Sequence, residues 1–193
     1  LDAIDDVDEP TTTAKANISN AVSSLLALSE QARQVERTFT GGDTDPGFES
    51  FTTLLRRQCA RVRREFPDVD VEASVTDAAY VVDGELETAV AELLTNAARH
   101  TDSATPTVEL DAEVADGDDS PWATITVRDD GPGVPDQERE VLAEGEETSL
   151  LHGSGLGLWL VNWVVTELGG DISIADNDPR GSVVTLTVPL LSV

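Results

Sequence analysis

Lysine, arginine and methionine are scarce in this chain of 193 residues. The sequence holds 12 Lys and Arg against 38 Asp and Glu, a formal net charge of −26, and Lys15 is its single lysine. So acidic a surface repels nucleic-acid phosphates and anionic lipid head groups, and we expect neither nucleic-acid binding nor a polybasic membrane anchor. Acidity with so little lysine favours a halophilic protein, because concentrated salt screens the repulsion between carboxylates.

Methionine is absent even from position 1, so we expect a processed product or a part of a longer protein. The single cysteine, Cys59, excludes an internal disulfide framework and fits a reducing compartment. The first ten residues do not resemble a secretory leader, and no uncharged stretch has the composition of a membrane span. These absences predict a cytoplasmic protein, with no direct membrane insertion by this chain.

Apolar residues are nevertheless frequent enough for a folded core, since Leu, Ile, Val and Phe make up about a quarter of the chain. Between Ile18 and Phe39 the apolar residues recur three and four positions apart, which predicts a long amphipathic helix over 11–40 that needs partner helices. The segment GGDTDPG breaks this pattern. We therefore predict two parts: an acidic lead-in with this helix at 1–41, and a second domain at 47–193.

The second part has the mixed pattern of an α+β domain. Helices are predicted at about 48–66, 84–100 and 156–168, and strands at 69–75, 79–82, 107–114, 122–128, 171–175 and 183–188. The strands at 107–114 and 122–128 are expected to pair, as are the last two. Five arginines of the first helix, Arg56, Arg57, Arg61, Arg63 and Arg64, form either a phosphate or partner contact or a solvated face that bridges to carboxylates.

A first candidate site motif is AELLTNAARH at 91–100. On a helix, Glu92, Asn96 and Arg99 share one stripe at i, i+4 and i+7, opposite an apolar face. A carboxylate, an amide and a guanidinium together could hold a metal-bound phosphate chain. The same stripe is also typical of a solvated helix face.

A second motif, RDDGPGV at 128–134, directly follows a predicted strand. Asp129 ends that strand, and Gly131 and Gly133 leave the turn beyond it without side chains. A ligand can then lie against the backbone while the carboxylate accepts hydrogen bonds from a base edge. The same letters also spell an ordinary turn.

A third motif, HGSGLGL at 152–158, stands at a predicted helix N-terminus. Gly153, Gly155 and Gly157 alternate so that consecutive backbone amides can face an anion. The spacing is G-x-G-x-G after a loop, whereas a dinucleotide-binding βαβ unit needs G-x-G-x-x-G after a strand. A dinucleotide site is therefore excluded.

Taken in order, these segments resemble the ATP-binding domain shared by sensor histidine kinases, gyrase-type topoisomerases, Hsp90-type chaperones and mismatch-repair proteins. They resemble the N box and the two glycine boxes of that superfamily, and GSVVTLTVP at 181–189 is similar to the closing strand of its kinase branch. The run at 155–174 resembles the histidine-kinase version in particular. The resemblance covers about 47–193 and implies a two-layer α/β sandwich, the Bergerat-type fold, with a mixed sheet packed on about three helices.

The resemblance also assigns roles. Asn96 would coordinate Mg²⁺, and Glu92 would orient or polarise the attacking group or a metal-bound water. Asp129 would accept a hydrogen bond from the adenine amino group, and Thr185 would face the adenine. The remaining ATP-binding positions would be Arg99, His100, Gly131, Gly133, Gly153, Ser154, Gly155, Leu156, Gly157 and Leu158. Residues from about 134 to 152 would form a lid.

The implied activity is that of an ATP-dependent protein-histidine kinase, a phosphotransferase of two-component signal transduction. His100 and His152 fall in nucleotide-site motifs, so the phosphate-accepting histidine is expected before Leu1. The helix at 11–40 resembles the second helix of the kinase dimerisation domain. The resemblance therefore implies a homodimer formed through this helix, and a response-regulator receiver domain as partner in the phosphorelay.

Two alternatives stay open at this point. One is an ATP-sensing interaction module that transfers no phosphate; the absence of phenylalanine after Phe66, with only Leu150 and Leu151 as substitutes in the lid, favours it. The pair Glu92 and Asn96 favours transfer. The other alternative is an ATP-hydrolysing clamp of the gyrase or Hsp90 kind, which the short lid and the second glycine box disfavour. The stimulus, the cognate regulator and any phosphatase activity are not written in the sequence.

Overall fold

The computed structural model describes residues 47–117, 120–136, 139 and 156–192. All of them belong to the second of the two units into which the chain divides, 44–193. The helix predicted at 11–40 lies outside the described residues. That helix and the domain bounds 1–41 and 47–193 therefore stay predictions.

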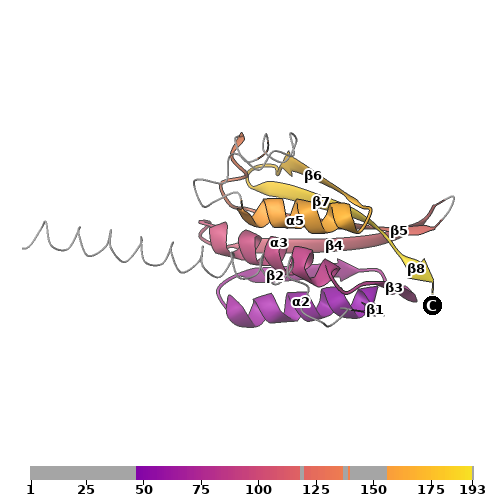
Figure 1. Cartoon of the computed structure of the whole chain (residues 1–193). Helices are drawn as coiled ribbons and strands as arrows, with labels where there is room; N and C mark the ends of the chain where they lie inside the picture. Colours follow the sequence, from indigo (N-terminus) through magenta and orange to yellow (C-terminus); the bar gives the residue numbers. More distant parts are fainter. Residues whose placement is uncertain (1–46, 118–119, 137–138, 140–155, 193) are drawn as a thin grey trace, which may run out of the picture. The chain divides into compact units, whose positions relative to one another are not determined.

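A mixed sheet of five strands forms one layer of the domain (Figure 1). Its order is β2 (Asp70–Val75), β4 (Thr107–Asp116), β5 (Pro121–Asp129), β7 (Ser182–Pro189) and β6 (Asp171–Asp176). β2 and β4 are parallel, and the other neighbours are antiparallel. The two strand pairs predicted from the sequence, β4 with β5 and β6 with β7, are both confirmed.

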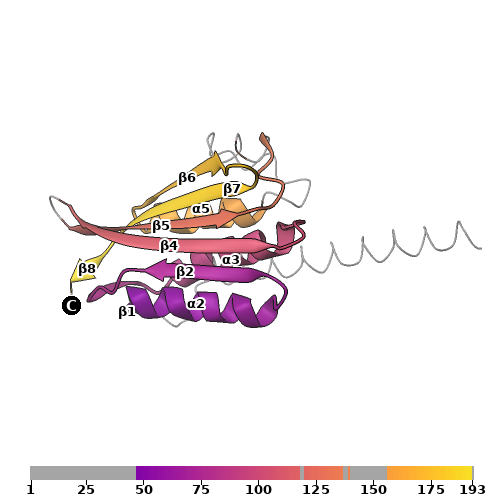
Figure 2. The same ribbon diagram turned by 180° about the vertical axis from the view of Figure 1, so that it is seen from behind.

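Three helices form the second layer: α2 (Phe51–Glu65), α3 (Leu86–His100) and α5 (Leu156–Glu167). In the view from behind, the sheet lies in front of α3 and α5, and α2 lies beside the edge strand β2 (Figure 2). Strand alternation explains the arrangement, because alternate residues of β5 and β7 are buried, and all of these except Ser182 are apolar: Ala123, Ile125, Val127, Val184, Leu186 and Val188. The α/β sandwich is confirmed, and no helix of the described residues is long and apolar enough to span a membrane.

A small sheet, β1 (Phe48–Ser50), β3 (Tyr80–Asp83) and β8 (Leu191–Ser192), was not fully predicted. The helix expected from residue 48 begins at Phe51, because residues 48–50 pair with β3 instead. Ser50 then caps α2, and its Oγ accepts a hydrogen bond from Thr53 N at 3.4 Å.

The arginines of α2 are engaged within the domain. Arg56 and Arg57 form ion pairs with Asp77 and Glu49 at 2.8 and 2.7 Å, and Arg63 Nε donates to Val71 O at 2.9 Å. These contacts support the second interpretation of the cluster, a solvated face that bridges to nearby carboxylates and carbonyls.

Candidate functional site

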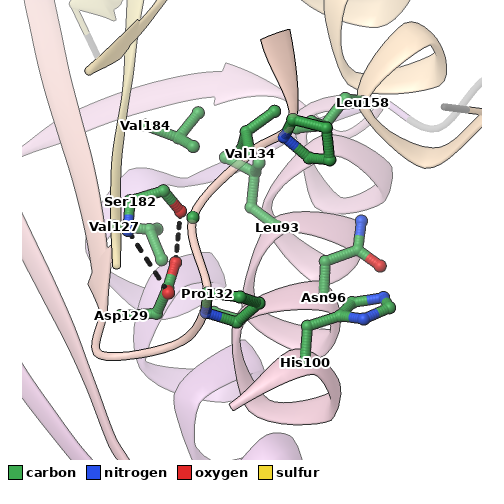
Figure 3. Close-up of a pocket in the computed structure, with 13 residues that line it drawn as sticks. Leu93, Asn96, His100, Val127, Asp129, Pro132, Val134, Leu158, Ser182 and Val184 are labelled. Carbon is green, nitrogen blue, oxygen red and sulfur yellow. Dashed lines mark hydrogen bonds between the residues drawn. The ribbon is translucent and has the colours of Figure 1, made fainter. Parts of the chain in front are cut away.

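A cavity of about 310 Å³ lies between α3, the end of β5, the turn after it and the start of β7 (Figure 3). Such a volume is at the lower end of those that hold small organic ligands. Most of the lining is apolar, and the polar side chains stand at separate points. The lining residues are Leu93, Asn96, Ala97, His100, Val127, Asp129, Pro132, Gly133, Val134, Pro135, Leu158, Ser182 and Val184.

Helix α3 supplies both apolar and polar groups to the cavity. Leu93 and Ala97 lie four residues apart on one stripe of the helix. Asn96 and His100, also four residues apart, lie on the adjacent stripe. The Nδ2 atom of Asn96 donates to Glu92 Oε1 at 3.2 Å. Within the described part of the chain nothing donates to Asn96 Oδ1, so this oxygen is available to a ligand.

The first turn of α5 packs against the same pair. A Cβ placed on Gly157 would lie 2.4 Å from Glu92 Oε1 and 2.7 Å from Asn96 Nδ2. Only a glycine allows so close an approach without moving these side chains. Glu92 and Asn96 therefore belong to a helix–helix contact at the cavity, and the alternative of a plain solvated face is wrong for them.

At the opposite end of the cavity, the carboxylate of Asp129 is held by three hydrogen bonds. Its Oδ1 accepts from Gly131 N at 2.9 Å and from Ser182 N at 3.3 Å, and its Oδ2 accepts from Ser182 Oγ. Figure 3 shows the two bonds from Ser182 as dashed lines. A carboxylate offers about four lone-pair sites, so it can accept one further hydrogen bond from a ligand.

The approach of Ser182 to Asp129 depends on the glycine before it. Gly181 has φ +110°, and a Cβ there would lie 1.9 Å from Asp129 O. Since an L residue is strained at this φ and the backbone leaves no room, glycine is required. The β6–β7 connection can thus lie directly against the end of β5.

Several of the described residues predicted for the site are not among those that line the cavity: Glu92, Arg99, Gly131, Gly157 and Thr185. Thr185 points to the other face of the sheet, where its Oγ1 lies 3.4 Å from Thr126 Oγ1, and Val184 faces the cavity instead. This corrects the expectation for Thr185, because neighbouring residues of a strand point to opposite faces. Arg99 is exposed at the end of α3 and does not line the cavity.

Other predicted positions lie at the cavity or outside the described residues. Gly133, which has φ +86°, lines the cavity, as do His100 and Leu158. Leu156 begins α5. Of the expected lid, Val134 and Pro135 line the cavity. The remaining expected positions, Gly153, Ser154 and Gly155, and the lid residues 137, 138 and 140–152 lie outside the described residues.

Ser182 is the main site residue that sequence reasoning missed. The signal was present, because Val184, Leu186 and Val188 give the inward phase of the last strand, and Ser182 shares that phase. A small polar residue on the buried face of a strand, directly after a glycine, indicates a polar contact at that point.

Residues 82–192 match the family described as histidine kinase-, DNA gyrase B-, and HSP90-like ATPase, and the chain belongs to this family. The signal transduction histidine-protein kinase/phosphatase MprB of Mycolicibacterium smegmatis is 29% identical over 182 residues, 92% of this chain and 36% of that protein. Its namesake in Mycolicibacterium vanbaalenii is 34% identical over 136 residues, 68% of this chain and 27% of that protein. The chain thus spans about a third of the length of these curated relatives, or less.

Solved structures place the fold in the histidine-kinase branch. The mycobacterial sensor histidine kinase MprB has a TM-score of 0.59 and 30% identity, covering 76% of this chain and 99% of that one. The ATP-binding domain of PrrB from Mycobacterium tuberculosis has a TM-score of 0.57 and 27% identity, covering 76% and 98%. The described domain is accordingly a histidine-kinase type of ATP-binding domain.

Proposed function

We propose that this chain is the catalytic part of a sensor histidine kinase that binds Mg-ATP and transfers its γ-phosphoryl group to a histidine encoded before Leu1. The observation that carries the proposal is the pair of polar groups at the two ends of one apolar cavity: the fixed carboxylate of Asp129 and the amide oxygen of Asn96. The names of the relatives, histidine-protein kinase/phosphatase, support it.

The Asp129 end fits an adenine ring. Apolar side chains from α3, β5 and β7 surround a space in which a flat ring can be buried, among them Leu93, Val127 and Val184. Asp129 can accept one more hydrogen bond, and the exocyclic amino group of adenine is a donor. A 6-oxo base would present an acceptor to this carboxylate and would be rejected.

The Asn96 end fits a magnesium ion shared with phosphates. Among the described residues no group of three or more His, Cys, Asp or Glu side chains could hold a metal. This suits Mg²⁺, which commonly takes one or two protein oxygens and completes its shell with phosphates and water. Asn96 Oδ1 would be that ligand, oriented by the hydrogen bond from its Nδ2 to Glu92, and the bound ion would neutralise phosphate charge.

The remaining polar groups would act around the phosphates. Glu92 would orient or polarise the attacking group, and Arg99 would offset phosphate charge from the end of α3. The backbone amides of Gly153, Gly155 and Gly157 would cradle the phosphates, and Ser154 lies between the first two in sequence.

The proposed setting is that of two-component signalling in the cytoplasm. We propose a homodimer formed through the helix at 11–40 and a response-regulator receiver domain as the next phosphate acceptor. The amphipathic pattern of 11–40 supports the first, and the kinase relatives support the second. The net charge of −26 supports a halophilic host with concentrated salt around the protein.

ATP binding is the first test. Calorimetry should detect binding to the whole chain in the presence of Mg²⁺, and Asp129→Asn should abolish detectable binding while circular dichroism is unchanged. The neighbouring variant Asp130→Asn, which alters a carboxylate outside the cavity, should bind as the wild type does. Retained affinity in Asp129→Asn would contradict the adenine assignment.

Phosphoryl transfer is the second test, and it separates the three candidate activities. The chain extended by its upstream encoded residues is incubated with ATP labelled at the γ-phosphate. Acid-labile, base-stable label on the protein supports the kinase. If ATP binds but neither labelled protein nor free phosphate is formed, the result supports the sensing module. Release of free phosphate without labelled protein supports the hydrolysing clamp.

A further inference from the structure

The connection between β6 and β7, residues 177–181, contacts Asp129, the residue at the end of the cavity where the adenine base is proposed to bind. Asn177 Nδ2 donates to Asp129 O at 2.8 Å, across 48 positions of sequence. Gly181, at the other end of the connection, lies so close to Asp129 O that no Cβ would fit. A segment with the composition of an ordinary turn is therefore built against the candidate site.

The side chain of Asn177 has a defined orientation. Its backbone N donates to Gly181 O at 3.0 Å, which closes the turn, and its Oδ1 accepts from Asp178 N at 3.0 Å. Because a backbone N–H can only donate, the oxygen of the amide must face Asp178. The NH₂ group is left to face the carbonyl of Asp129, which can only accept.

The two ends of the β6–β7 connection therefore bind the main chain and the side chain of the same residue, Asp129. Asn177 binds the main-chain carbonyl of Asp129, and Ser182, just beyond Gly181, binds its carboxylate through both N and Oγ. The first contact restricts the backbone at the end of β5, and the second restricts the side chain. A hydrogen-bonding group in an active site recognises its ligand best when its position is fixed before binding.

We propose that Asn177 is a positioning residue for nucleobase selectivity: it fixes the backbone from which the Asp129 carboxylate reaches the 6-amino group of adenine. The proposal rests on the proposed function, in which Asp129 reads that amino group. Asn177 itself does not line the cavity and contacts Asp129 only through the carbonyl. Its loss should weaken the discrimination between bases more than the binding of the sugar and phosphates.

The variant Asn177→Asp tests this with almost no change of shape. It keeps an oxygen for Asp178 N and replaces the donor that faces Asp129 O by an acceptor. The dissociation constants of ATP and of ITP, whose base carries a 6-oxo group, are measured by calorimetry on the whole chain with Mg²⁺. Replacing this hydrogen bond by a repulsive contact should raise the Kd for ATP by about tenfold and leave the Kd for ITP within about twofold.

Two further variants control for charge and folding. Ala175→Asp adds the same charge at an exposed position of β6 in the same hairpin, and its ratio of ITP to ATP constants should equal that of the wild type. Asn177→Ser removes the long donor without adding charge and should lower the ratio by about threefold. Thermal unfolding of each variant shows whether the domain is intact, and the serine variant serves if the aspartate variant does not fold.

The ratio of ITP to ATP constants decides between the outcomes. A lower ratio in both Asn177 variants, with Ala175→Asp unchanged, supports the positioning role. An unchanged ratio, or equal weakening of both nucleotides, overturns it and leaves Asn177 as a purely structural turn residue. If the wild type itself fails to prefer ATP to ITP, the adenine assignment of the proposed function fails, which is a separate result from the behaviour of the variants.

Discussion

The two ends of the cavity are built in different ways. At the Asp129 end, main-chain atoms of β5, β7 and the β6–β7 connection contact one another directly, as the position of Gly181 against Asp129 O shows. At the Asn96 end, the contact is between Gly157 and the side-chain ends of Glu92 and Asn96. Side-chain ends can move at small cost, whereas backbone in the middle of a sheet cannot. We infer that substitutions at the Asp129 end lower the free energy of unfolding of the domain. Substitutions at the Asn96 end should leave the domain folded.

The variant Gly181→Ala should have the largest effect. Its Cβ would meet Asp129 O at 1.9 Å and the residue would be strained at φ +110°. Steric overlap and left-handed backbone strain together predict a loss of about 3 kcal/mol or more in the free energy of unfolding. Urea denaturation measures the loss, and ATP binding should fall with it because Ser182 is displaced from Asp129.

Gly169→Ala is the matched control for this variant. Gly169 also has a left-handed backbone, φ +77°, but no atom lies within 4 Å of the point that a Cβ would occupy there. The control should lose only the strain energy, about 1 kcal/mol. Similar losses in the two variants would show that the close approach of Gly181 to β5 adds nothing to stability, and the comparison between the two ends of the cavity would then fail.

Asn96→Ala should have the opposite profile at the other end. Its one side-chain hydrogen bond within the described residues is to Glu92 on the same helix, and alanine is the better helix former, so the stability should change by less than about 1 kcal/mol. The affinity for ATP in Mg²⁺ should fall by roughly tenfold or more, and removal of Mg²⁺ with a chelator should then have no further effect.

Thr95→Ala provides the control on the adjacent side of α3. Thr95 accepts a hydrogen bond from Arg61 of α2 at 3.2 Å and does not line the cavity. This variant should retain the full Mg²⁺ dependence of ATP binding. Should Asn96→Ala keep that dependence as well, the metal role of Asn96 would be wrong.

The same contrast separates what the sequence could predict from what it could not. The shared helix face of Glu92 and Asn96 can be predicted because helical spacing is a local property, readable within one turn. The contact from Asn177 to Asp129 joins residues 48 positions apart, so no local pattern reveals it. Strand pairs follow from alternation, whereas the adenine-facing position of Thr185 rests only on the resemblance to the kinase closing strand. In the structure Thr185 lies on the opposite face of β7, and Val184 faces the cavity.

The short strand β1 illustrates a second limit. Residues 48–50 continue the pattern of α2 well enough to be predicted as helix, yet they pair with β3 in the structure. Strand pairing depends on a partner more than thirty residues away, and three residues carry too little periodicity to compete with a helix pattern. The helix cap at Ser50 was the one local signal of the true start, since its Oγ accepts from Thr53 N.

Ionic strength should change the binding of the ATP phosphates at the Asn96 end of the cavity. It should hardly change the binding of the base at the Asp129 end. The chain carries a net charge of −26, and ATP is a polyanion, so the two repel each other at low salt. Raising KCl from 0.1 to 1 M shortens the screening length from about 10 to 3 Å. We expect the Kd for ATP in Mg²⁺ to fall by about threefold or more over this range.

Adenosine is the control ligand in the salt series, because it presents the base without phosphate charge. Its Kd should change by less than about twofold over the same range, since the Asp129 end binds a neutral ring. A parallel change for ATP and adenosine would point to a salt effect on the fold as a whole. An ATP affinity that falls with salt would contradict the screening argument.

The smallest effect is expected at Asp130, which lies beside the base end but outside the cavity. Burial alone would raise the pKa of this carboxyl, but hydrogen bonds from Thr101, Thr107 and Ser103 outweigh burial and leave the pKa below its ordinary value. A lowered pKa in the folded state stabilises the fold above the ordinary carboxyl pKa of about 4, and this stabilisation is lost as pH falls through the lower folded pKa.

Asp130→Asn should therefore cost less than about 1 kcal/mol at pH 7, since the group is only partly shielded from solvent. The difference in the free energy of unfolding between this variant and the wild type should shrink as pH falls below about 4. There Asp130 takes up a proton in both the folded and the unfolded wild type. Urea denaturation between pH 3 and 7 measures it, with the exposed carboxylate variant Asp136→Asn as a control for the loss of one charge. A difference that grows toward low pH would reverse the sign and exclude a stabilising carboxylate at Asp130. The expected result would instead show that even beside the rigid end of the cavity a partly exposed contact contributes little, and that rigidity there comes from the backbone.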